Sequence, residues 1–443
     1  MALGRKPVTK RADPYPKNVR GAQKRRKTTN VPTARKVKLA SDVEKIPIPS
    51  LPSTVGNVFV VGSGECGQLG AGEMQERKKF GRLSYFDGKE IVDIAVGPLH
   101  NVAITRQGKM YTWGCNDHGA LGRVTDDDEE RTPGLVDEAE LQGVKIMKAA
   151  CGGSLTIALS DEGDLYATGT FKSEDGIIGF SSEKPRHQQY RFALYEPASL
   201  LEIADIACGV NHAALLTTDG HVYTWGSSEQ FQLGRRGSPR HKSLTLVPEI
   251  VNQLKKLRIV KIGCGNFHTL AADEEGHIYA WGLNNARQCL LDPGKYGGIH
   301  IKEPTQIPFF ENVKVKQLAA GMHHSVVLLE NGQVYTFGSK ENGKMGLGGD
   351  ETSNKGCSTI TDLKPLDLPV IKSIAVGDFH NYALTEDGET YSWGDGVSGQ
   401  LGNGEETCEY MPYLIEDERF EDQFHIKQIG CGSQHTVLFG VVR

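Results

Sequence analysis

An aromatic-glycine step that recurs at a nearly constant interval constrains this chain more than any other feature. The seven glycines of the step are Gly62, Gly114, Gly169, Gly226, Gly282, Gly338 and Gly394. They lie 52 to 57 residues apart, and a constant interval indicates one repeated structural unit. A histidine recurs within the units. It stands at His100, His212, His268, His324, His380 and His435, with Leu155 in the second place.

Each unit contains the pattern of a β-hairpin. Two short apolar runs are split by a turn pair such as Asp219-Gly220, which supplies the positive φ that tight hairpins need. A run such as 203–207 before the histidine, and a Gln-Leu-Gly strand such as 232–234 after the tryptophan, bring the count to about four strands, the content of one propeller blade. The sequence therefore predicts an all-β, seven-bladed propeller.

The two ends of the repeat region predict how the ring closes. Residues 58–70 hold only the second half of a unit, and residues 431–438 hold only the first half. We expect one blade to be built from both ends, which leaves no open sheet edge. The propeller is expected to cover residues 55–443, with residues 1–54 outside it as a disordered basic tail.

Composition argues against several classes of protein. No apolar run approaches the roughly 20 residues that span a bilayer, so we expect no membrane partner. Residues 1–6 lack the apolar core of a secretory signal, which favours an intracellular protein. The nine cysteines form no Cys-x-x-Cys pair, and we expect free thiols rather than a disulfide or zinc framework. Because the histidines fall on different blades, we expect them to be structural, with no metal and no cofactor.

Two stretches resemble nucleotide-binding motifs. Residues 62–67 match G-x-G-x-x-G, but no helical pattern follows them. Residues 338–344 resemble a phosphate loop, but Met345 replaces the hydroxyl residue that would bind magnesium. Both stretches fall at repeat positions, so we expect this chain to bind no nucleotide itself.

The charge of the chain is unevenly distributed. Residues 1–50 carry 14 Lys or Arg against three acids, a net charge of +11, whereas the whole chain carries −5. Residues 51–443 therefore carry −16, and contact with DNA is expected mainly from the tail. Two basic groups in the tail have the spacing of a bipartite nuclear-import signal. They are Lys10 and Arg11, followed by Lys24, Arg25, Arg26 and Lys27. The alternative is a solubilising or nonspecific RNA-binding tail.

The repeat G-x-x-H-x-x-x-L, then D-G-x-x-Y-x-W-G, then Q-L-G, resembles the regulator of chromosome condensation family over everything after the tail. Repeats of the WD type differ, because their period lies near 40 residues. Three stretches that are not repeat features also resemble the members of this family that act on the small GTPase Ran. They are residues 76–79, 114–123 and 169–179.

The resemblance implies a guanine-nucleotide exchange factor for Ran that acts on chromatin in the nucleus and supports nucleocytoplasmic transport and mitosis. It implies that a wedge, here Phe171 to Gly179, meets the phosphate loop of Ran. The implied exchange surface consists of Glu65, Phe171, Lys172, Ser173, Glu174, Asp175, Asn211, Arg235, His324 and His435. Exchange needs no covalent chemistry, so no catalytic residue is expected. The chain departs from the family pattern at Gly153, Leu155 and Asn211.

The same resemblance implies further partners. A basic loop of the third repeat, with Arg235, Arg236 and Arg240, would grip the acidic patch of histones H2A and H2B on the nucleosome, because the arginine fork binds carboxylates in pairs. The tail would add DNA contacts and bind a nuclear import receptor. For the loop alone, the alternative is an ordinary solvated loop.

Two other functions fit the same ring, since a fold does not fix a function. One is a noncatalytic interaction scaffold in chromatin or ubiquitin pathways. The other is a light sensor like the plant ultraviolet-B receptor, which would need clustered tryptophans. The four tryptophans here all stand at blade positions: Trp113, Trp225, Trp281 and Trp393.

Overall fold

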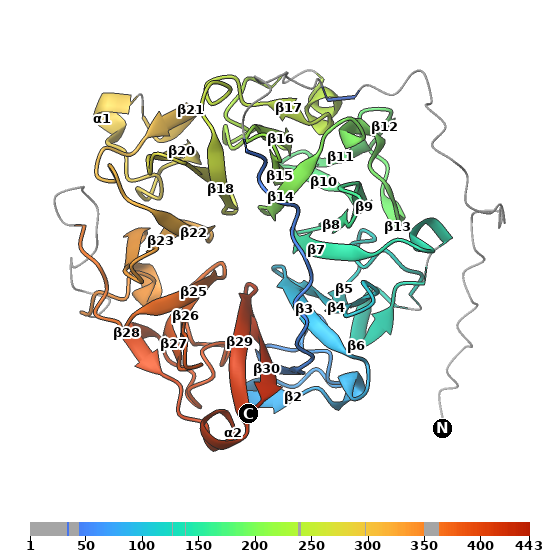
Figure 1. Ribbon diagram of the computed structural model, residues 1–443, viewed down its shortest axis with the longest axis vertical. Coiled ribbons are helices and arrows are strands. Elements are labelled where there is room, and N and C mark those ends of the chain that lie inside the picture. The colour runs from blue at the N-terminus through green and yellow to red at the C-terminus, as the bar shows by residue number, and fades with distance from the viewer. Residues whose placement is uncertain are drawn as a thin grey trace, which may run out of the picture.

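The computed structural model is a closed ring of seven β-sheets (Figure 1). It describes residues 33–34, 44–125, 127–137, 139–237, 241–296, 298–349 and 363–443. The innermost strand of each sheet contacts the innermost strand of the next sheet, all the way around the ring. The predicted seven-bladed propeller is therefore confirmed.

The blades are named here in chain order. The first holds β3 (Ile91–Val96), β4 (His100–Thr105), β5 (Met110–Cys115) and β6 (Glu129–Leu135). The second holds β7 (Ile146–Cys151), β8 (Leu155–Ser160), β9 (Leu165–Gly169) and β13 (Gln189–Leu194). The third holds β14 (Ile203–Cys208), β15 (His212–Thr217), β16 (Val222–Gly226) and β17 (Glu249–Ile250). The fourth holds β18 (Ile259–Cys264), β19 (His268–Asp273), β20 (Ile278–Leu283) and β21 (His300–Gln306).

The remaining blades complete the ring. The fifth holds β22 (Val315–Ala320), β23 (His324–Leu329) and β24 (Val334–Gly338). The sixth holds β25 (Ile371–Val376), β26 (His380–Thr385), β27 (Thr390–Gly394) and β28 (Glu409–Leu414). The closing blade holds β29 (Phe424–Cys431), β30 (His435–Val442), β1 (Asn57–Gly62) and β2 (Arg77–Arg82).

An eighth, smaller sheet and a few short helices lie outside the blades. The sheet consists of β10 (Phe171–Ser173), β11 (Gly176–Ser181) and β12 (Lys184–Pro185). The α-helices are α1 (Pro293–Tyr296) and α2 (Glu418–Asp422). The 3-10 helices are η1 (Ser84–Phe86), η2 (Ala139–Leu141), η3 (Glu196–Ala198), η4 (Lys242–Leu246) and η5 (Glu341–Gly343). In the described part of the chain, no helix has the length and apolar character needed to cross a membrane.

The closing blade joins the two ends of the ring, as the half repeats predict. β1 pairs with β30 in antiparallel register, from Asn57 opposite Gly440 to Gly62 opposite His435. β29 then contacts β3 of the first blade, so the inner circle has no gap. The predicted pairing of amino-terminal and carboxy-terminal strands is confirmed.

The Gln-Leu-Gly steps do not form strands, so that part of the prediction is wrong. Residues 232–234 form a turn, and the fourth strand of the third blade is β17, further along the chain. The main-chain oxygen of Gln232 accepts a hydrogen bond from Nε1 of Trp281 in the next blade, at 2.9 Å. Gly234 has a φ of +63°, and a Cβ there would lie 2.8 Å from the same Nε1. The turn therefore accommodates the tryptophan of the next blade.

The recurring histidines link neighbouring blades, which is the structural role expected for them. Each Nε2 lies 2.7–2.9 Å from a hydroxyl or amide oxygen in the next blade. The pairs are His100–Thr156, His212–Thr269, His268–Ser325, His324–Asn381, His380–Thr436 and His435–Asn101. Each of these partners also donates to a main-chain oxygen of the blade that carries its histidine, as Thr156 does to Ala120. A hydroxyl partner thereby uses its proton, and an asparagine Oδ1 can only accept, so the histidine Nε2–H must be the donor.

The cysteines of the described residues are all free thiols, as expected. Burial raises the pKa of the Cys151 thiol to about 12. The same cause raises the pKa of Cys264 to about 12. Such thiols remain protonated and unreactive at neutral pH.

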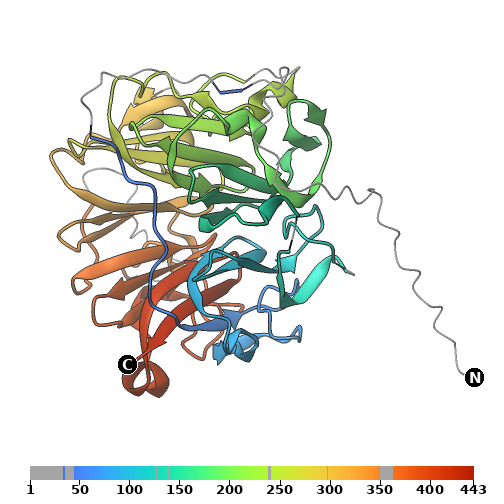
Figure 2. The same ribbon diagram turned by 45° about the vertical axis from the view of Figure 1, so that its right-hand side comes forward.

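Described residues before the predicted boundary at residue 55 also contact the ring, among them Ala34, whose main-chain N donates to Pro197 O at 2.8 Å. Figures 1 and 2 show residues 44–56 as an extended segment that crosses one face of the ring. The main-chain N of Ile46 donates to Thr218 O at 2.7 Å, and Lys45 pairs with Glu202 at 2.6 Å. Ile46, Ile48 and Leu51 pack against the cores of successive blades. This segment is hereafter called the strap (residues 44–56).

Candidate functional site

The predicted wedge is a β-hairpin inserted after β9 of the second blade. β10 and β11 pair with Lys172 opposite Ile177 and Ser173 opposite Gly176, so Glu174 and Asp175 form the tip. Gly169, the last residue of β9, pairs with Leu155, which stands in the histidine position of the second blade. Asn211 directly precedes His212, the histidine of the third blade. The hairpin and Asn211 therefore lie at the same end of their blades. Figure 1 places β10 and β11 beside β15 and β16 of the third blade.

The base of the hairpin is fixed by an apolar contact. Phe171 is 1% exposed, and its ring lies 6.3 Å from that of Trp225 in an edge-on arrangement. Gly226 makes room for it, since a Cβ at that position would lie 2.7 Å from Phe171 Cδ1. Tyr195 also packs against Trp225, with the ring centroids 5.9 Å apart. Phe171 is therefore an anchor in the core rather than a side chain offered to a partner.

Polar contacts fix the rest of the hairpin to the third blade. The main-chain N of Lys172 donates to Asn211 Oδ1 at 3.2 Å. At the tip, the main-chain N of Glu174 donates to Glu229 Oε2 at 2.8 Å, and Gln230 Nε2 donates to Glu174 Oε1 at 3.2 Å. Asn211 thus acts as an acceptor for the main chain of the hairpin, a role that an aspartate at this position could also fill.

Lys242 is the charged partner of the hairpin. Its Nζ lies 2.7 Å from Asp175 Oδ2, 2.6 Å from Glu229 Oε1 and 3.4 Å from Ser173 Oγ. The hydrogen bond to Lys242 lowers the pKa of the Asp175 carboxyl, and the bonds to Asp175 and Glu229 raise the pKa of Lys242. Lys242 and Asp175 are therefore both charged at neutral pH.

His118 of the first blade lies near Lys172 of the hairpin, so the first blade also borders this site. Burial lowers the pKa of the His118 imidazole, and the nearby positive charge of Lys172 lowers it further. The sequence prediction included Lys172 but gave His118 no role beyond a family-like stretch. His118 is neutral at physiological pH, because both influences oppose protonation.

Sequence reasoning missed Glu229, Gln230 and the role of Lys242. Glu229 had a detectable signal, because it stands three residues after Gly226, as Glu65 stands three residues after Gly62. Lys242 had no such signal, because it lies in a basic loop outside the repeat and meets Asp175 only through the fold.

Glu65 lies in the loop after β1 of the closing blade. It is exposed, and its main-chain N donates weakly to Ser63 Oγ at 3.4 Å. Among the described residues, no hydrogen bond or ion pair joins it to the hairpin. Its assignment to an exchange surface stays a prediction.

His324 and His435 cannot be surface contacts in this structure, which corrects their predicted role. Both are 0% exposed and bond to the next blade through Nε2. Burial lowers the pKa of each imidazole to about 3, so both are neutral. They hold the ring together and cannot meet a partner while it is intact.

Arg235 is also corrected, from surface residue to internal brace. Its side chain is 10% exposed and pairs with Glu249 at 3.2 Å. Its Nη2 donates to the main-chain oxygens of Thr224 and Val247 at 3.1 and 3.2 Å. Arg123, which also follows a Leu-Gly step, donates to Thr112 O at 3.1 Å in the same way. The Leu-Gly-Arg spacing was the signal for this structural role.

The other predicted basic residues have mixed outcomes. Arg236 is exposed and follows the brace directly. Arg240, and the tail residues Lys10, Arg11, Lys24, Arg25, Arg26 and Lys27, lie outside the residues that the structure describes. Their assignments to nucleosome, DNA and import-receptor binding stay predictions.

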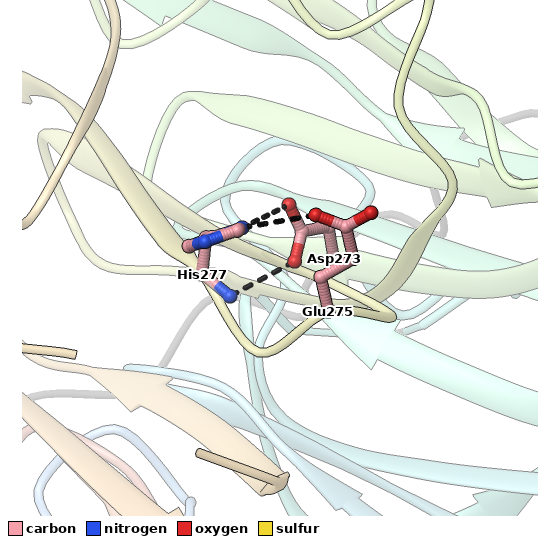
Figure 3. Close-up of side chains that lie close together, drawn as sticks. All are labelled: Asp273, Glu275 and His277. Atoms are coloured by element: carbon pink, nitrogen blue, oxygen red, sulfur yellow. Dashed lines mark hydrogen bonds and ion pairs between the residues drawn. The ribbon is translucent and has the colours of Figure 1, made fainter. Parts of the chain in front are cut away.

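One group in the described part of the chain has ligand atoms close enough for a metal ion: Asp273, Glu275 and His277, at the turn between β19 and β20 (Figure 3). The oxygens of the buried Asp273 are already occupied. Oδ1 accepts from His277 N at 2.8 Å, and Oδ2 accepts from His277 Nδ1 at 3.0 Å and from Tyr279 OH at 3.2 Å. This network accounts for the arrangement as a hairpin turn, so it needs no metal ion.

The fold and the site together define a class of protein: a seven-bladed propeller in which one blade carries an exposed, clamped hairpin. The family model of the RCC1-like domain matches residues 57–438, so the chain belongs to that family. That range runs from β1 to β30, the whole ring. The predicted resemblance to the regulator of chromosome condensation family is thereby confirmed.

Relatives in the family have different functions. Protein pim1 of Schizosaccharomyces pombe is 33% identical to this chain, over 96% of this chain and 82% of pim1. The guanine nucleotide exchange factor SRM1 of Saccharomyces cerevisiae is 30% identical, over 87% of each protein. The ultraviolet-B receptor UVR8 of Arabidopsis thaliana is also 30% identical, over 80% of this chain and 76% of UVR8. Overall identity therefore does not separate an exchange factor from a receptor.

Solved structures agree with the fold over most of its length. A crystal structure of Prp20p from Saccharomyces cerevisiae, described with its binding properties to Gsp1p and histones, has a TM-score of 0.81 at 30% identity and covers 89% of this chain and 93% of Prp20p. A structure of Kap60 bound to yeast RCC1 (Prp20) has a TM-score of 0.82 at 28% identity and covers 94% of this chain and 96% of that one.

Proposed function

We propose that this chain is a guanine-nucleotide exchange factor for the small GTPase Ran, acting on chromatin in the nucleus. The observation that carries the proposal is the hairpin β10–β11, whose tip is charged and exposed while its base is anchored in the core of a rigid ring. Membership of a family that includes SRM1 supports it.

The mechanism is a competition between ligands of Ran and needs no covalent chemistry. A hairpin that enters the nucleotide site stabilises the nucleotide-free form of Ran and so weakens the bound nucleotide by the same factor. The positive charge of Lys172 can meet acidic groups that otherwise hold magnesium, and Glu174 can repel the phosphates. GTP then displaces the factor by mass action.

Rigidity is what makes the hairpin suited to this work. A flexible hairpin would lose conformational entropy on entering Ran, which would weaken the nucleotide-free complex. Here the packing of Phe171 on Trp225 and the hydrogen bonds to Asn211 and Glu229 hold it before Ran arrives. In this proposal the buried His324 and His435 and the ion-paired Arg235 contribute only by keeping the ring rigid.

Chromatin attachment and nuclear import are assigned to the other basic segments. Arg236, with Arg240 beyond the described residues, would bind the acidic patch of histones H2A and H2B, and the tail would contact DNA and a nuclear import receptor. The descriptions of Prp20p with histones and with Kap60 support these partners. Together they support a nuclear, chromatin-bound protein.

The test is the release of a fluorescent guanine nucleotide from purified Ran. We expect the full chain to accelerate release, and a variant with Lys172, Glu174 and Asp175 changed to alanine to lose about 100-fold or more of that acceleration. A matched triple variant, with Lys372, Glu386 and Asp387 of the sixth blade changed to alanine, keeps it. If the unaltered chain does not accelerate release, the scaffold function replaces this proposal.

A further inference from the structure

Lys242 stands at the centre of a charge clamp that joins the hairpin tip to the third blade. Its Nζ contacts Asp175, Glu229 and Ser173 at 2.7, 2.6 and 3.4 Å. These three contacts use all three protons of an ammonium group. We call Lys242, Asp175 and Glu229 the clamp.

The clamp has a sheltered end and an exposed end. The side chains of Lys242 and Glu229 are 29% and 24% exposed, whereas that of Asp175 is 83% exposed. The lysine therefore belongs to the blade side, and the tip of the hairpin reaches back to it. Without the lysine, the carboxylates of Asp175 and Glu229 would face each other with no positive charge between them and would repel.

Glu229 connects Lys242 to the main chain of the hairpin tip. While Oε1 binds Lys242, Oε2 accepts from the main-chain N of Glu174 at 2.8 Å. Fixing Glu229 therefore fixes the turn itself, not only one side chain. An isolated two-stranded hairpin is marginally stable in water, so such anchoring decides whether the tip keeps one conformation.

The position of Lys242 is itself set by the blade. It begins η4, and Thr245 of the same helix donates to Gly226 O at the end of β16, at 2.6 Å. η4 also packs against β11. Lys242 is thus positioned beside the hairpin by a short helix that is hydrogen-bonded to the ring.

We propose that Lys242 is a positioning residue for nucleotide exchange, which holds the β10–β11 hairpin in the conformation that enters the GTPase. The inference rests on the proposed function. It assigns a role to a residue that lies outside the hairpin and outside the repeat pattern. It also means that Asp175 forms an ion pair with Lys242 within the protein before any partner binds.

The experiment compares the full chain with Lys242→Met, Lys242→Arg and, as a matched control, Lys372→Met, which removes a lysine from an ion pair of 3.1 Å with Glu386 in the sixth blade. Hydrogen exchange measured by mass spectrometry reports the hairpin without any partner. Nucleotide release from Ran, measured over a range of Ran·GDP concentrations, separates kcat from KM.

We expect Lys242→Met to lose protection from exchange in peptides covering residues 171–181 and nowhere else. Its kcat should fall about fivefold, the size expected for loss of a partly exposed ion-pair network, with KM unchanged. Lys242→Arg restores both readouts, and Lys372→Met alters neither.

Three results would overturn the inference: unchanged protection of the hairpin, a looser hairpin with unchanged kcat, or a rise in KM alone, which would make Lys242 a direct contact of Ran. If the unaltered chain fails to release nucleotide from Ran, the proposed function is wrong and this inference falls with it. The hydrogen-exchange result would then still report whether Lys242 holds the hairpin, so the two failures are distinguishable.

Discussion

Six junctions between neighbouring blades are built alike, and the junction between the second and third blades is built differently. At each of the six, a buried histidine bonds to a polar side chain of the next blade, which in turn bonds back to a main-chain oxygen. Between the second and third blades, Leu155 and Ala213 stand at these two positions, and both are buried.

The comparison shows why these departures occur together. The β10–β11 hairpin stands where other blades have the turn that supplies the main-chain acceptor, such as Gln232 O. A buried hydroxyl without that acceptor would be costly, by about 1–3 kcal/mol, so an apolar pair replaces both polar partners. Phe171 fills the space beside Trp225 instead. The place where the repeat breaks is therefore the place where a functional element is inserted.

The largest expected effect comes from breaking a regular junction. Trp281→Ala removes a fully buried ring and its bond to Gln232 O, so the free energy of unfolding should fall by about 3–5 kcal/mol. Exchange activity per folded molecule should not change. Phe171→Ala, at the divergent junction, should lower both stability and activity. Urea unfolding and nucleotide release check the two variants, and a loss of activity in folded Trp281→Ala would contradict the distinction.

A second prediction concerns substitutions that make a regular junction resemble the junction between the second and third blades. Burial lowers the pKa of His212 to about 3, so the folded chain keeps it neutral while the unfolded chain protonates it below about pH 6.5. Its contribution to stability is therefore present above pH 6.5 and is lost as the pH falls. The double variant His212→Leu, Thr269→Ala removes this group.

Between pH 7.5 and pH 5, the unaltered chain should lose about 2 kcal/mol more stability than that double variant, the amount that linkage gives for one such histidine. Urea unfolding at the two pH values measures the difference. Equal losses for both proteins would show that His212 is not held neutral in the folded ring.

The smallest effect is expected at Asn211, which joins the divergent junction to the hairpin. Asn211→Ala removes the acceptor for the main-chain N of Lys172 and should slow nucleotide release about fivefold, since one hydrogen bond contributes about 1 kcal/mol. Asn211→Asp retains an acceptor oxygen and should release nucleotide at least as fast as the unaltered chain. Single-turnover release distinguishes them, and a slow Asn211→Asp would mean that the amide itself contacts Ran.

The sequence predicted the ring and its closure because both follow from the repeat. It placed the fourth strands wrongly because these outer strands carry no constant pattern. β2 reads RKKFGR, whereas β17 has only two residues. The contacts of the strap could not be predicted, because they are isolated, such as Ile46 to Thr218, and follow no repeat.

The site was predictable only where residues adjoin in sequence. The wedge at residues 171–179 was expected from a local stretch that resembles the family, and in the structure this stretch forms a hairpin. The contact between Lys242 and Asp175 joins residues of two blades, so it follows from the fold alone. Arg235 shows the opposite error, because a basic loop suggested a surface arginine where the repeat position, shared with Arg123, indicated an internal brace.

The most direct test of the account is the affinity of the full chain for Ran, measured with GDP bound and with the nucleotide removed. An exchange factor must bind nucleotide-free Ran more tightly, and we expect a difference of about 100-fold or more, the coupling that accelerated release requires. The Lys172, Glu174 and Asp175 alanine variant should lose that difference. Equal affinity of the unaltered chain for both forms of Ran would mean that it binds without promoting exchange, and would contradict the account.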